Sequence, residues 1–113
     1  MKLVPLAAAL CLLSGSALAE ADAAAGLAAI QALGQLNGQA LACSQMAMSG
    51  QSKSLMIKHA PKTRNYGEVF EAATSAAYLE QGRDQDTCPK PVEFAARLSE
   101  LSGRLQATLP AAQ

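Results

Sequence analysis

The N-terminal residues decide how much of the chain remains to fold and in which compartment it folds. Lys2 supplies a positive charge, and the apolar run of residues 3–13 follows it. Residues 17–19 read Ala-Leu-Ala, so small side chains stand at positions −3 and −1 before a cut that leaves Glu20 first. This order of charged, apolar and small residues is typical of a secretory signal peptide and predicts cleavage between Ala19 and Glu20.

An uncleaved membrane anchor is the alternative for the same residues. The apolar stretch offers roughly 11 to 16 residues, whereas a helix that spans a bilayer needs about 20. Lipid attachment would need a small residue directly before the cysteine, and Leu10 precedes Cys11. We therefore expect a signal peptide over residues 1–19 and a single helical domain over residues 20–113. The mature protein is expected to be periplasmic or secreted, with no stable membrane anchor.

The length and net charge of the mature chain limit the number of domains and the kinds of partner. Cleavage leaves 94 of the 113 residues, which is enough for one domain with a modest core. The whole chain has nine basic and nine acidic side chains, and loss of Lys2 gives the mature chain a formal charge of −1. Nucleic-acid-binding domains are usually strongly basic, so this balance argues against nucleic acid as a partner.

Two of the three cysteines, Cys43 and Cys88, remain in the mature chain, because Cys11 leaves with the signal peptide. An even pair of cysteines in an oxidising compartment predicts a disulfide. The two residues are 45 positions apart, for which the chain-entropy model gives a stabilisation of about 4 kcal/mol. The sequence has no Cys-x-x-Cys motif, so we interpret the bond as structural and not catalytic.

The composition of the mature chain favours helices. Alanine, leucine, glutamine and glutamate dominate, β-branched residues are scarce, and no long stretch alternates apolar with polar residues. The last part of the chain is the most clearly amphipathic, with apolar residues at Phe94, Leu98, Leu101, Leu105 and Leu109. The sequence therefore predicts an all-α fold, a small bundle of three to four helices closed by one disulfide.

The ends of the expected helices carry signals of their own. Ser49-Gly50 predicts a break after the first helix. Asn65 and Glu68 have the spacing of a capping box at the start of the third helix, and Thr63 is an alternative cap. The expected helices cover residues 22–48, 52–59, from about 63 to the residue before Gly82, and about 89–109. Gly82 is expected at C′, the first position beyond the third helix.

A stripe of small residues predicts how one pair of helices packs. Gly34, Gly38 and Ala42 are four residues apart and therefore lie on one face of the first expected helix. Glycine inside a helix costs about 1 kcal/mol relative to alanine. We therefore expect a packing reason for these residues, namely the close approach of another helix backbone.

A basic segment lies between the two cysteines. No acidic residue occurs between Asp22 and Glu68, while four cations and the single histidine of the chain fall in this interval. One interpretation is a surface that binds a protein or an anionic ligand. The alternative is a corner between helices whose cations neutralise the acidic residues that follow. The candidate binding surface consists of Lys53, Lys58, His59, Lys62, Arg64 and Tyr66.

Soft donor atoms near the same segment raise a copper(I) alternative. Met46, Met48 and His59 could join a reduced Cys43, whereas a disulfide would remove the best of these ligands. A closed zinc site needs four Cys or His ligands, and the chain has one histidine. No Gly-x-Ser-x-Gly motif and no Gly-rich phosphate loop is present in the sequence. We therefore predict no catalytic residue, no metal and no cofactor.

The overall layout, a signal peptide before a helical domain with one long-range disulfide, resembles that of the small periplasmic acid-stress chaperones. That family carries a tryptophan beside its first cysteine and a more charged tail. The present chain has no tryptophan and ends in the apolar run Pro110-Ala111-Ala112 before its last residue. The resemblance implies a periplasmic holdase or binding partner and assigns no residues.

Together these observations predict a non-enzymatic exported helical protein that binds a protein or an anionic ligand through residues 53–66. The alternatives are a copper(I)-handling periplasmic protein, and a periplasmic stress chaperone or enzyme accessory. The state of Cys43 and Cys88 separates the binding protein from the copper protein, because an intact disulfide removes the best soft ligand.

Overall fold

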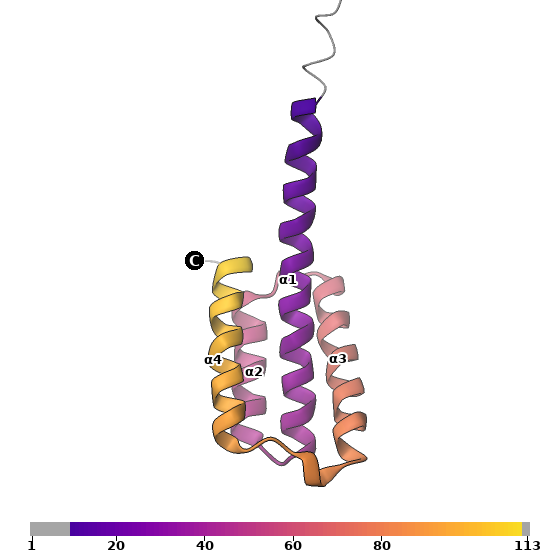
Figure 1. The fold of residues 1–113 in the computed structure, drawn as a ribbon, viewed down its shortest axis with the longest axis vertical. Helices are drawn as coiled ribbons and strands as arrows, with labels where there is room; N and C mark the ends of the chain where they lie inside the picture. The colour runs from indigo at the N-terminus through magenta and orange to yellow at the C-terminus, as the bar shows by residue number, and fades with distance from the viewer. Residues whose placement is uncertain (1–9, 112–113) are drawn as a thin grey trace, which may run out of the picture.

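The computed structural model describes residues 10–111, and its regular elements are all helical. Within that range four α-helices and one 3-10 turn follow one another along the chain (Figure 1). They are α1 (Leu10–Ala42), α2 (Met46–His59), α3 (Arg64–Gly82), η1 (Gln85–Thr87) and α4 (Pro91–Thr108). None of these helices is long and apolar enough to cross a membrane. The predicted all-α fold is confirmed.

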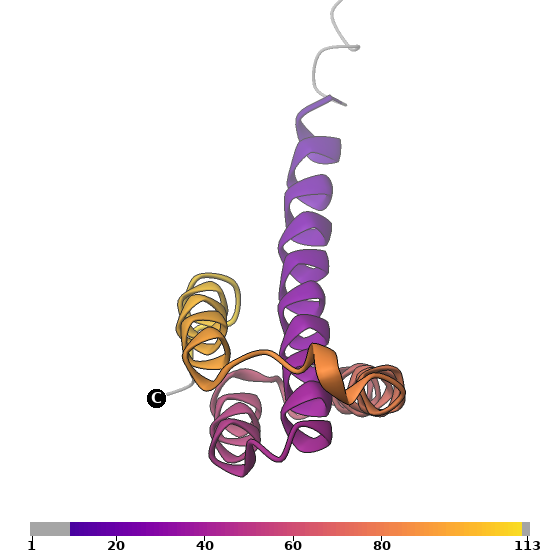
Figure 2. The same ribbon diagram turned by 60° about the horizontal axis from the view of Figure 1, so that its bottom comes forward.

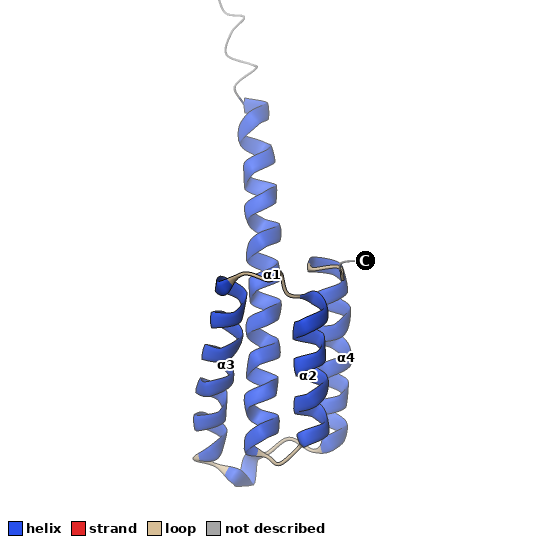
Figure 3. Ribbon diagram, turned by 180° about the vertical axis from the view of Figure 1, so that it is seen from behind, coloured by secondary structure: helices blue, strands red, loops and turns tan. Residues whose placement is uncertain are grey.

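The central helix of the bundle is α1. Figure 2 shows α2 and α4 on one side of α1 and α3 on the other, and Figure 3 shows the bundle from behind, with α2 and α3 nearest the viewer. The apolar face of α4 is buried as predicted, apart from Leu109, which is partly buried. The core consists of Ala29, Ile30, Leu33, Leu36, Ala40, Ala60, Phe70, Phe94, Leu98, Leu101 and Leu105.

The first part of α1 projects beyond the ends of the other helices (Figure 1). Residues 1–9 of the expected signal peptide lie outside the described residues, and residues 10–19 are the start of α1. Among residues 22–111, Gly26 is the first buried position on α1, where it faces the side chain of Leu109. Cleavage between Ala19 and Glu20 would thus leave the core residues in the mature chain, and it stays a prediction.

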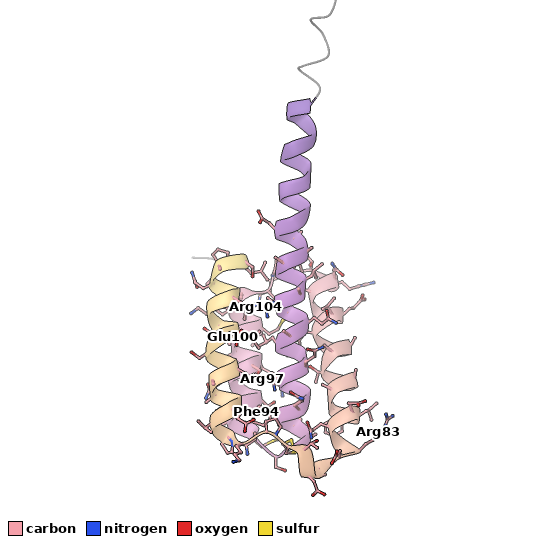
Figure 4. The ribbon with its side chains drawn as sticks, in the orientation of Figure 1. Arg83, Phe94, Arg97, Glu100 and Arg104 are labelled. Carbon is pink, nitrogen blue, oxygen red and sulfur yellow. A yellow bond between two sulfur atoms is a disulfide. The ribbon has the colours of Figure 1, made fainter. Side chains whose placement is uncertain are left out.

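The disulfide joins the end of α1 to the segment that leads into α4. Cys43 and Cys88 are bonded through their sulfur atoms, and their Cα atoms are 5.8 Å apart. The bond lies at the lower end of the bundle in Figure 4. The predicted pairing is therefore confirmed, and it encloses α2 and α3 in one covalent loop.

The boundary between α1 and α2 differs from the prediction. Helix α1 ends at Ala42, and Ser49-Gly50 lies inside α2 instead of between two helices. Ser44 makes the turn with a φ of 60°, in the left-handed region that favours glycine. Ser49 stays helical because its buried hydroxyl bonds to Asn37 on α1. Gly50 is exposed inside α2 and costs the helix only its low propensity.

The ends of α3 also differ from the expected signals. Thr63 is the N-cap residue, but its side chain makes no capping hydrogen bond, and the capping box of Asn65 and Glu68 is not formed. Gly82 is the last residue of α3 instead of the first residue beyond it. The chain turns after α3 because Gln81 Nε2 donates to the Asp84 carbonyl at 2.9 Å, which holds the loop against the helix end.

The predicted close approach of another helix is confirmed at Gly34 and Gly38, the first two residues of the stripe with Ala42, where α1 meets α3. A Cβ atom built on Gly34 would lie 2.6 Å from the Phe70 carbonyl oxygen. A Cβ atom on Gly38 would overlap the Thr74 carbonyl oxygen and lie 2.8 Å from the amide nitrogen of Tyr78. Atoms do not approach so closely without a shift of the backbone, so the two helices can meet only where α1 lacks side chains.

A chain of hydrogen bonds crosses the same region and links three helices. Ser49 Oγ on α2 donates to Asn37 Oδ1 on α1 at 2.7 Å. Asn37 Nδ2 donates in turn to Thr74 Oγ1 on α3 at 3.2 Å, and Thr74 Oγ1 donates to the Gly34 carbonyl at 3.2 Å. Within the described residues every buried side-chain nitrogen and oxygen has a partner, so the buried Asn37 is fully compatible with the core.

Candidate functional site

The candidate binding residues fall into three groups by exposure. Lys53, Lys58, Lys62 and Arg64 are exposed, Tyr66 is half-buried and packs against the core, and His59 is buried. Lys58, Lys62 and Arg64 lie where α2 ends and α3 begins, and we call these three residues the basic corner. Three of the six candidates are therefore exposed at or beside the connection between α2 and α3.

His59 does not belong to the exposed surface. Its side chain is 5% exposed, and Nδ1 donates a hydrogen bond to the Leu109 carbonyl oxygen at 2.7 Å. Because a carbonyl can only accept, the proton of this bond is on Nδ1. His59 thus ties the end of α2 to the end of α4, which is a structural role that its position in a basic run does not reveal.

Lys53 is separated from the basic corner by the geometry of α2. Five residues along an α-helix correspond to a rotation of about 140° relative to the starting side chain. Lys53 and Lys58 therefore extend from different sides of α2. Lys58 lines a groove of about 460 Å³ between α2 and α4, whose other polar lining residues are Gln51, Ser54, Ser99 and Ser102.

Lys62 stabilises the corner itself. Its Nζ atom donates to the Ile57 carbonyl oxygen at 2.6 Å, in the last turn of α2. Lys58 stands in the same turn, where a positive charge interacts favourably with the negative end of the helix dipole. Lys58 and Lys62 therefore contribute to the end of α2 in addition to any contact with a partner.

Arg64 has no such structural explanation. It is the first residue of α3, where the helix dipole is already positive, and the first turn of α3 carries no acidic residue. A positive charge at this position is unfavourable for the helix. The arrangement raises the positive potential at the corner, which favours carboxylate or phosphate groups of another molecule.

The acidic residues of α3 and η1 do not neutralise the basic corner. Within residues 10–111 the single ion pair shorter than 4.0 Å joins Arg83 to Glu80 at 3.7 Å, near the opposite end of α3. The cations of the corner thus have no carboxylate within ion-pair distance in the described part of the chain.

The soft donor atoms are not gathered into a metal site. Cys43 is bonded to Cys88 and is not a free thiolate. Met46 and His59 are the first and last residues of α2, about 20 Å apart at a rise of 1.5 Å per residue. Among the described residues there is no group of three or more His, Cys, Asp and Glu side chains that could hold a metal ion.

The sequence did not reveal a groove that lies between α1 and α3. It has a volume of about 670 Å³, a row of glutamines on α1 and a row of alanines on α3. Arg97, labelled in Figure 4, reaches this groove from α4 and donates from Nη1 to Gln39 Oε1 at 2.7 Å. The four-residue spacing of Gln31, Gln35 and Gln39 is visible in the sequence and could have indicated one polar face of α1.

The fold and the corner together define a disulfide-closed four-helix protein with an exposed basic junction. Comparison of the chain with models of known protein families, with curated proteins and with solved structures finds no match.

Proposed function

We propose that this chain is an exported, non-enzymatic interaction module that binds an acidic protein surface through the basic corner. The observation that carries the proposal is that Lys58, Lys62 and Arg64 are exposed, and that no carboxylate of the described residues lies within ion-pair distance of them. Exposed cations without a carboxylate partner among the described residues attract a complementary negative surface and speed association with it.

The shape of the corner favours a protein over a small anion. The three cations lie at the ends of two helices and on the connection between them, and of the three only Lys58 lines a groove. A small anion would be held better by an enclosed pocket with several converging donors. A broad acidic surface suits cations that are spread over a helix end, a connection and a helix start.

Two features support an exported location for the protein. Residues 1–19 have the pattern of a secretory signal peptide. The bond between Cys43 and Cys88 is of a kind that persists in oxidising compartments and is rare in the cytosol. The proposed interaction therefore takes place in the periplasm or outside the cell.

Charge reversal at the corner tests the proposal. The double variant Lys58→Glu/Arg64→Glu leaves Lys62 in place, since Lys62 supports the end of α2. Binding to a polyglutamate peptide, measured by isothermal titration calorimetry at low salt, is expected to weaken by at least about tenfold. Capture of acidic proteins from a periplasmic extract should fall in parallel. Binding by the wild type should weaken steeply as salt is raised, because exposed charges are screened.

A matched control separates a specific corner from general charge. Lys90→Glu/Arg104→Glu changes the net charge by the same amount at exposed positions on or next to α4. This control variant should bind like the wild type. Equal binding by the corner variant and the wild type, or an equal loss in both variants, would show that the basic corner is not the site.

A further inference from the structure

The outer face of α3 is exposed along the length of the helix. Figure 2 shows α3 on the opposite side of α1 from α2 and α4, so the face that points away from α1 has no helix of the bundle against it. Leu79 on this face is 60% exposed, although a large apolar side chain gains free energy when it leaves water. Ser75 is exposed as well, and so are Ala72 and Ala76, which lie between this face and the groove along α1.

The exposed face has a pattern that is complementary to itself. Along this face the exposed residues of α3 and its C-cap residue run in the order Glu68, Ala72, Ser75, Ala76, Leu79 and Arg83. The series begins with an acid, ends with a base and has small residues at its centre. In an antiparallel pair with its centre between Ser75 and Ala76, Glu68 lies opposite Arg83. In the same register Ala72 lies opposite Leu79, so a small side chain faces a large one.

We propose that a second copy of this chain packs antiparallel on the outer face of α3, with a two-fold axis between Ser75 and Ala76. Such an interface is isologous, so each contact occurs twice. Glu68 of each copy pairs with Arg83 of the other, and Leu79 of each copy fills the space above Ala72 of the other. No other face of the bundle contributes to the contact.

The charges of α3 support this occupant. Arg83 is paired with Glu80 at 3.7 Å, but their side chains are 76% and 83% exposed, and such surface pairs contribute little. Arg83 is therefore free to turn toward Glu68 of the second copy. In this register Glu71 of one copy and Glu80 of the other lie at the same height along the two helices. Each of these carboxylates is rotated around the helix axis by roughly 70° or more from the contact face, given 3.6 residues per turn, so they do not meet in the contact.

The length of α3 sets the strength of the contact. Its 19 residues span about 28 Å at 1.5 Å per residue. Two helices of this length bury an area at the low end of specific interfaces, which is typical of weak and reversible complexes. We therefore expect a dimer that forms in the micromolar to millimolar range and dissociates on dilution.

Sedimentation velocity of the oxidised mature chain from about 1 μM to 1 mM tests the proposal. The wild type should shift from monomer to dimer over this range. Leu79→Lys should raise the dissociation constant at least about tenfold, since it places a charge in the centre of the contact. Each single reversal, Glu68→Arg or Arg83→Glu, should weaken the dimer, and the two together should restore it, because the swap recreates both ion pairs.

Controls keep the test independent of folding and of the basic corner. Glu100→Arg reverses an exposed charge on α4 and should leave the dissociation constant unchanged. Circular dichroism should show that all variants are folded, because the substituted side chains are exposed. The double variant Lys58→Glu/Arg64→Glu should still form the dimer. The proposal would be overturned if the wild type stayed monomeric at 1 mM. It would also be overturned if the double variant Glu68→Arg/Arg83→Glu, with Leu79 unchanged, did not form the dimer again.

Discussion

Gly38→Ala is expected to destabilise the bundle by about 2–4 kcal/mol, although alanine is the better helix former. The new Cβ atom would overlap the Thr74 carbonyl oxygen and crowd the Tyr78 amide. Both contacts are with backbone atoms, so α1 and α3 would have to move apart and lose packing along their length. Urea unfolding followed by circular dichroism measures the change in the free energy of unfolding.

Gly50→Ala is the matched control for this substitution. Gly50 is also inside a helix, but a Cβ atom built on it has no neighbour within 4 Å. Helix propensity alone then applies, and the variant should be more stable than the wild type by about 0.5–1 kcal/mol. If alanine stabilised the protein at both positions, the close approach of α1 and α3 at Gly38 would be wrong.

Removal of the disulfide is the second substitution with a large expected effect. The double variant Cys43→Ser/Cys88→Ser should lose about 4 kcal/mol of stability, because the bond closes a long loop and restricts the unfolded chain. For a domain of this size the loss corresponds to a fall in Tm on the order of 20 °C. Thermal unfolding followed by circular dichroism measures it.

Reduction of the wild type provides an independent check on the same bond. A reducing agent should lower the Tm of the wild type to about that of the double variant, and should leave the Tm of the double variant unchanged. A loss of less than about 1 kcal/mol in the variant would contradict a stabilising role for the bond between Cys43 and Cys88.

Those features that depend on the local sequence could be predicted. Helical composition and the apolar spacing of α4 indicate amphipathic helices before any tertiary contact is known. The stripe of Gly34 and Gly38 indicated a close helix contact, because glycine is costly in a helix unless backbone atoms approach it. The pairing of Cys43 with Cys88 followed from the count of cysteines that remain after the expected cleavage.

The boundary between α1 and α2 could not be predicted, because tertiary contacts override the local signal. Ser49-Gly50 has the composition of a break, and Ser44 has no glycine-like signal. The hydroxyl of Ser49 finds its acceptor in Asn37, twelve residues earlier on another helix. Only the assembled bundle places that acceptor within reach, and burial of the pair keeps Ser49 helical.

The basic segment was predicted as one surface, and the structure divides it. Helical periodicity alone indicates that Lys53 and Lys58 extend in different directions, so that separation could have been found in the sequence. The burial of His59 could not, because its partner is the Leu109 carbonyl, fifty residues later. The position of Lys62 likewise depends on a backbone oxygen at the end of α2.

The most direct test of the proposed exported, disulfide-closed interaction module is native mass spectrometry of the chain recovered from the cells that produce it and from their medium. The expected species has the mass of residues 20–113 less the two hydrogen atoms lost to the disulfide, alone or with an acidic protein bound. A species that retains residues 1–19, or one that carries a metal ion on reduced Cys43, would contradict the proposed function.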